Sequence, residues 1–115
     1  MTRAERPPPL PGERPPTRDQ LDQAVRALEL LADETRLALL YVLTHGEYDV
    51  NTLATLVGSS LTSTSQHLAK LRAGGLVATL RDGKRVIYRA KGRHVRRLVI
   101  ETIAQAQRLA PSNTE

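Results

Sequence analysis

The chain has 115 residues and a net charge of +5, and it contains no cysteine, phenylalanine or tryptophan. This length allows one domain with a core of modest size, and the lack of cysteine excludes disulfides, thiolate metal ligands and a cysteine nucleophile. Residues 60–100 carry ten Lys and Arg against one acid, a net +9, whereas residues 1–59 carry a net −3. One half of the fold is therefore predicted to be a cationic surface that suits a phosphate backbone.

Six of the seven prolines lie within residues 1–17. Such a composition offers little to bury, so we expect a disordered arm there, a folded domain over 18–110 and a disordered tail over 111–115. A polyproline II ligand for a partner is the alternative for the arm. Apolar runs are too short for a membrane span and the N-terminus has no signal-peptide core, so we expect a cytoplasmic protein without a membrane partner.

Three helices are predicted before residue 60. Apolar residues recur at helical spacing over residues 17–32, and a nearly all-apolar stretch over 36–43 predicts a central second helix. Asp49 is expected to cap a short third helix over 50–57, which ends at Gly58.

Residues 61–72 are the predicted recognition helix of a helix-turn-helix. Ser60 or Thr62 is its expected N-cap, and the Gly74-Gly75 pair ends it. Thr64, Leu68 and Leu71 share one face by their spacing and are expected to be buried. The opposite face is short, polar and uncharged, as base readout in a major groove requires; it carries Thr62, Ser65, Gln66 and Ala69. An ordinary amphipathic helix with a solvated Ser/Thr face is the alternative.

After Gly75 the pattern alternates, and residues 76–81 and 85–90 predict two strands around Asp82-Gly83. A hairpin that follows a recognition helix is interpreted as a wing. Its tip carries Arg81, Lys84 and Arg85, which are placed to meet phosphates. A soluble edge hairpin protected by charge is the alternative.

The last predicted helix spans residues 94–109 and has a long apolar stripe. The small core cannot cover this stripe, so we predict a homodimer formed by the first and last helices. The expected interface residues are Leu21, Val25, Val95, Leu98, Val99, Ile103 and Ala106.

Three segments together resemble the ArsR/SmtB family of winged helix-turn-helix metalloregulators. They are residues 31–37 (LADETRL), 65–77 (SQHLAKLRAGGLV) and 82–88 (DGKRVIY), in the order that the family has them. The resemblance implies a mainly α fold with a small β-hairpin, and a homodimer that binds inverted-repeat operator DNA and is typically released by a metal ion. The positions that match the family's DNA contacts are Thr62, Ser63, Ser65, Gln66, Lys84 and Arg85. Lys70, Arg72 and Arg81 are further cations for the DNA backbone.

The metal half of the family pattern matches poorly. The positions that correspond to the family's site on the last helix are Gly92, His94, Gln105 and Arg108. Only His94 is a ligand type, and the arginines beside it repel a cation. Because the C-terminal half most resembles nickel- and cobalt-sensing members, nickel or another divalent transition metal remains a hypothesis, with His94 and either Glu101 or a chain-terminal group as ligands. His67 is interpreted as a structural histidine between the recognition helix and the core.

The leading interpretation is a dimeric, sequence-specific transcriptional regulator. A winged-helix module that binds a protein instead of DNA is the first alternative, although it has no need of so cationic a half. A regulator controlled by a protein partner rather than a metal is the second. The sequence has no recognisable catalytic motif or phosphate-binding loop, so we do not expect an enzyme.

Overall fold

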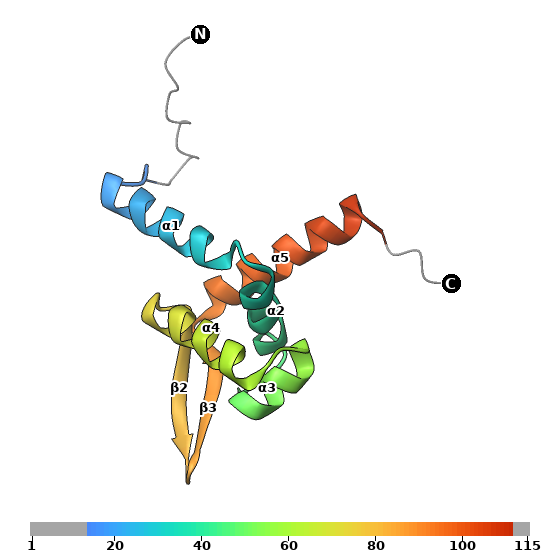
Figure 1. The fold of residues 1–115 in the computed structure, drawn as a ribbon. Helices are drawn as coiled ribbons and strands as arrows, with labels where there is room; N and C mark the ends of the chain where they lie inside the picture. Colours follow the sequence, from blue (N-terminus) through green and yellow to red (C-terminus); the bar gives the residue numbers. More distant parts are fainter. Residues whose placement is uncertain (1–13, 112–115) are drawn as a thin grey trace.

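The computed structural model describes residues 14–111, which form five helices and three strands. In chain order these are α1 (Arg18–Leu31), α2 (Glu34–Leu43), β1 (Tyr48–Asp49), α3 (Val50–Val57), α4 (Leu61–Ala73), β2 (Val77–Asp82), β3 (Arg85–Ala90) and α5 (Arg93–Leu109). Figure 1 shows α2, α3 and α4 packed together, with the β2–β3 hairpin projecting to one side and the free ends of α1 and α5 to the other. The expected arm and tail lie largely outside the described residues.

Side-chain caps explain where the helices begin. Thr17 caps α1 in a reciprocal pair with Gln20, and Asp49 accepts a hydrogen bond from the Thr52 amide at the start of α3. Asp33 accepts from the Arg36 amide at 2.9 Å, so α2 begins two residues earlier than predicted. Of the two predicted caps of α4, Ser60 is the one used.

The sheet is antiparallel with the strand order β1-β3-β2. Val77 pairs with Ala90 and Asp82 with Arg85, and Gly83 turns the hairpin with a φ of 66°. The predicted hairpin is therefore confirmed, with the first strand shifted by one residue. The short strand β1, which pairs with Tyr88 and Ile87 of β3, was not predicted because two residues carry no periodic signal.

The core is built from leucine and valine. Its fully buried side chains are Leu39, Leu40, Leu43, Leu53, Leu68, Leu71, Val77 and Val99, together with Thr64. The prediction that Thr64, Leu68 and Leu71 form the inner face of α4 is confirmed. Each fully buried leucine or valine contributes about 1.5–3 kcal/mol.

The prediction that Val99 lies on a free dimer face is wrong. Val99 has no exposed surface within the single chain, and Val95 and Ile103 are partly buried against the same core. The reason is that α2 has apolar residues on more than one side. The helix α5 packs across α2 and buries one of these sides. Leu98 and Ala106 of the predicted stripe remain exposed. Within residues 14–111, no helix is both long and apolar enough to cross a membrane.

Candidate nucleic-acid interface

The exposed side of α4 presents a polar, uncharged surface. Thr62, Ser65, Gln66 and Ala69 are all exposed; we call this set the reading face. Ser63, which was also predicted to contact DNA, is half-buried at its edge. Because Leu68 and Leu71 are fully buried on the other side, α4 cannot turn the reading face inward without losing its core contacts.

The helices α3 and α4 are joined by a tight turn. Gly58 adopts a left-handed conformation with a φ of 70°, which ends α3, and Ser60 then caps α4. Leu53 of α3 and Leu68 of α4 are both fully buried in one cluster. This is the helix-turn-helix arrangement, with α4 in the place of the second helix.

The β2–β3 hairpin carries exposed cations. Arg81, Lys84 and Arg85 are all exposed at its tip. Among residues 14–111, Lys84 has no ion pair, whereas Arg85 Nη2 lies 3.0 Å from Asp49 Oδ2 and Arg85 Nε donates to the same oxygen at 3.2 Å. Asp49 thus caps α3 and also holds the tip of the wing, through Arg85. This pair could not be predicted from sequence patterns, because its members are 36 residues apart.

The pKa of the Asp49 carboxyl lies below its usual range. The largest cause is the hydrogen bond from the Thr52 backbone, followed by a hydrogen bond from the Thr52 side chain. Burial opposes these effects, and the guanidinium of Arg85 lowers the pKa further. The Asp49 carboxyl is therefore ionised at near-neutral pH, where DNA binding is expected. Its charge keeps Arg85 positioned but also offsets part of the positive charge that Arg85 brings to the wing.

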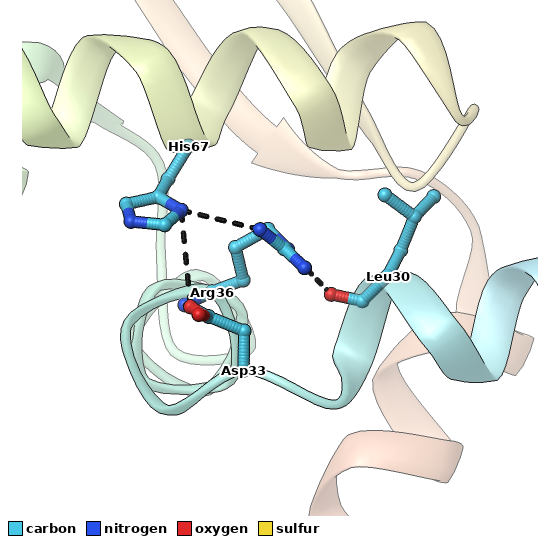
Figure 2. A network of polar contacts seen from close by, with 4 residues as sticks. All are labelled: Leu30, Asp33, Arg36 and His67. Atoms are coloured by element: carbon cyan, nitrogen blue, oxygen red, sulfur yellow. Dashed lines mark hydrogen bonds and ion pairs between the residues drawn. The ribbon is translucent and has the colours of Figure 1, made fainter.

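The ring of His67 lies on the inner side of α4, as predicted, with its side chain about one-fifth exposed. Figure 2 shows one nitrogen of this ring facing both Asp33 and Arg36, at the start of α2, while Arg36 also donates to the carbonyl of Leu30 at the end of α1. The Asp33 pKa is lowered, chiefly by the hydrogen bond from the Arg36 backbone.

An apolar cleft of about 390 Å³ lies between α1 and α5. We call it the α1–α5 cleft; its lining consists of Ala24, Ala27, Leu28, Leu76, His94, Val95 and Leu98. The outer side of α1 is also apolar, with Val25 52% and Leu28 53% exposed. Leu28 was not among the predicted interface residues, although it follows Leu21 and Val25 at helical spacing.

The described residues do not fit a transition-metal site. His94 lies at the edge of the α1–α5 cleft, and within residues 14–111 no group of three or more His, Cys, Asp or Glu side chains gathers at one place. Such a site needs about four donors, and exposed Arg93 and Arg97 add like charge beside His94.

The chain is similar to known bacterial regulators. Residues 33–79 match the model of the bacterial regulatory protein arsR family. The transcriptional regulator KmtR of Mycobacterium tuberculosis is 44% identical over 105 residues, which span 91% of this chain and 76% of KmtR. The transcriptional repressor SmtB of the same organism is 34% identical over 92 residues, which span 80% of this chain and 68% of SmtB.

The fold is similar to that of a solved domain of the same kind. The homodimeric winged helix-turn-helix DNA-binding domain of Mb0332 from Mycobacterium bovis superposes with a TM-score of 0.74 at 34% identity, over 92% of this chain and 99% of that one. The position of α4, the wing that follows it and the sequence identity to KmtR and SmtB all indicate the same family. This chain therefore belongs to the ArsR family of winged helix-turn-helix transcriptional regulators.

Proposed function

We propose that the protein binds an inverted-repeat operator as a homodimer, with the reading face of α4 in the major groove of each half-site. The main support for this proposal is the chemistry of the reading face. Thr62, Ser65 and Gln66 bring compact hydroxyl and amide groups to the surface of a helix whose opposite side is fixed in the core. Such groups reach base edges, and the amide of a glutamine can make two hydrogen bonds to adenine.

The surrounding cations position the protein on the DNA backbone. Lys70 and Arg72 are exposed in the last turn of α4, and Arg81, Lys84 and Arg85 are exposed on the wing. Contacts from these side chains to phosphates add affinity and fix the register without choosing the sequence.

A second copy of the chain is the proposed occupant of the α1–α5 cleft. Leu21, Val25, Leu28, Leu98 and Ala106 are the exposed apolar residues that it would cover. The homodimeric state of the M. bovis domain supports this arrangement. A two-fold interface also matches an inverted repeat, because each half-site then meets an identical recognition helix.

We assign no role in this function to a metal ion, because the His, Asp and Glu side chains within residues 14–111 do not gather into a metal site. Calorimetric titration of the untagged protein with nickel or another divalent transition metal tests the hypothesis of a metal site at His94 and Glu101. A site with two side-chain donors is expected to leave operator affinity unchanged. A stoichiometric heat that also weakens operator binding would contradict this.

Selection of bound duplexes from a randomised library tests the proposed function. The expected product is an inverted repeat whose half-sites are centred about 10–10.5 base pairs, or a multiple of that, apart. Recovery of unrelated sequences at equal affinity would contradict specific readout. A complete lack of DNA binding would instead favour the winged-helix protein-interaction module.

The wing should contribute affinity without specificity. Removing one phosphate contact per protomer takes two from the dimer, so Lys84→Ala should lower the log–log salt slope by about 1.8. Lys84→Ala combined with Arg85→Ala should weaken selected and random duplexes alike. Arg108→Ala, which removes an exposed cation from the far end of α5, is the matched control. Fluorescence anisotropy over a salt series measures the slopes, and a slope equal to that of the wild type in the wing variants would remove the wing from the interface.

A further inference from the structure

The segment LADETRL has no role in the function proposed so far. Its Asp33 and Arg36 lie at the start of α2, and both face His67, which is the residue after Gln66 on α4. His67 Nδ1 is 3.4 Å from Arg36 Nη1 and 3.8 Å from Asp33 Oδ2. One nitrogen of the recognition helix therefore has a cation and an anion within reach.

The two partners of Nδ1 exclude each other. A neutral imidazole with a lone pair on Nδ1 accepts a hydrogen bond from the guanidinium of Arg36. A protonated imidazole has no lone pair, so Nδ1 can only donate, and the carboxylate of Asp33 is the acceptor within reach. Protonation would also place two positive groups side by side, because Arg36 is always charged.

Arg36 also holds the end of α1. Its Nε donates to the carbonyl oxygen of Leu30 at 2.6 Å, so the same guanidinium contacts the last turn of α1 and the middle of α4 (Figure 2). The Leu30 side chain packs on Gly74, where an added methyl group would overlap its Cδ1 atom. The helix that lines the α1–α5 cleft thus touches the recognition helix at its middle, through Arg36, and at its end.

We propose that Arg36 and His67 are positioning residues that couple α1 to the reading face of α4, and that protonation of His67 releases this coupling. The inference rests on the proposed function, since it assigns a regulation to the same reading face. The neutral ring keeps the bridge from Leu30 through Arg36 to α4, and with it a fixed angle between the two recognition helices of a dimer. Because α4 is held in the core of its own protomer, loss of the bridge lets α1, and with it the partner protomer, shift relative to α4.

Within residues 14–111, Arg36 and Asp33 are the only side chains that form a hydrogen bond or ion pair with the His67 ring. Asp33 and Arg36 face it from α2, α1 contributes the Leu30 carbonyl, and α3 has no titratable side chain. Lys70 lies one turn further along α4, and the charged residues of β2, Arg81 and Asp82, lie at the wing tip.

The ratio of affinities for the selected operator and a scrambled duplex tests the proposal. Histidine changes charge between pH 5 and 8. We therefore expect the wild-type ratio to fall about fivefold or more when the pH is lowered from 8 to 5; a factor of about five is the lower end of the usual range of coupling between two sites. Affinity for the scrambled duplex should not fall, because protonation adds a positive charge.

Three variants separate the bridge from general effects. In His67→Asn the amide oxygen stands close to the position of Nδ1 and takes up no proton, so the ratio should stay near its wild-type value at pH 8 and no longer depend on pH. Arg36→Lys keeps the positive charge, but an ammonium group cannot reach the Leu30 carbonyl and His67 Nδ1 together as the planar guanidinium does. Its affinity ratio at pH 8 should therefore match that of the protonated wild type. His45→Asn, at an exposed position on the C-terminal side of α2, should behave as the wild type.

Nitrogen-15 spectra of the His67 ring in the DNA-free protein give an independent readout. They should find Nδ1 unprotonated at pH 8, with the proton on Nε2. A wild-type ratio that does not change with pH, or an equal change in His67→Asn, overturns the coupling. If His67→Asn does not fold, the wild type, His45→Asn and Arg36→Lys still decide. A wild type that fails to discriminate at pH 8 overturns the proposed function itself, whereas discrimination that is independent of pH overturns only this inference.

Discussion

Leu98→Glu should convert the protein from a dimer to a folded monomer. Leu98 is 39% exposed on the α1–α5 cleft, so a carboxylate there stays in water in the monomer and is buried only in the dimer. Desolvating one carboxylate per protomer costs several kcal/mol each, which corresponds to a dimer dissociation constant raised about a thousandfold or more. Because one protomer spans only one half-site, operator affinity should fall with it.

Val99→Glu, one residue along, should behave differently. Val99 is fully buried within its own chain, so the carboxylate would be placed in the core of the protomer. An unpaired buried charge costs several kcal/mol against a total stability of about 5–15 kcal/mol, so this variant should unfold. Sedimentation velocity and circular dichroism together distinguish the two outcomes.

Leu56→Glu is the matched control for Leu98→Glu, because Leu56 is a leucine of α3 that is 53% exposed and lies away from the cleft. It should remain dimeric. A dimeric Leu98→Glu, or a wild type that is monomeric at micromolar concentration, would show that the α1–α5 cleft is not the interface.

Gln66→Ala should change which operator is preferred rather than whether DNA is bound. Its exposed amide is the only group of the reading face able to make a bidentate contact with adenine, which is worth about 1–3 kcal/mol of discrimination at one base pair. One position in each half-site should therefore lose its preference by about fivefold to a hundredfold. Affinity for random duplexes should persist, since Lys70, Arg72 and the wing are unchanged.

A repeated selection measures this effect. Gln107→Ala, which makes the same change on the exposed surface of α5, should return the wild-type operator. If Gln66→Ala also returns the wild-type operator with the same relative affinities, Gln66 does not read bases.

Local chemistry made most of the fold predictable. Asp49, Ser60 and Gly58 mark helix ends by side-chain hydrogen bonds or left-handed geometry, and these depend on residues a few positions apart. The alternating pattern around Asp82-Gly83 predicted the wing for the same reason. The inner face of α4 followed from a spacing that only a helix satisfies.

Contacts between distant segments could not be predicted in this way. The Arg36–His67 contact joins residues 31 positions apart, and the Arg85–Asp49 pair joins residues 36 apart. Val99 was assigned to the wrong partner because an apolar stripe predicts burial but not the surface that provides it. The candidate DNA contacts were predictable as a face of one helix, whereas the pair that ties the wing to α3 needed the tertiary structure.

Backbone amide shifts of the labelled protein, recorded with and without the selected operator, test most directly whether α4 and the wing form the DNA surface. We expect the largest changes at residues 60–70 and 81–86 and small changes along the second half of α5, which Figure 1 places away from the wing. Changes concentrated on α1 and α5, with Ser65, Gln66 and Lys84 unaffected, would contradict it.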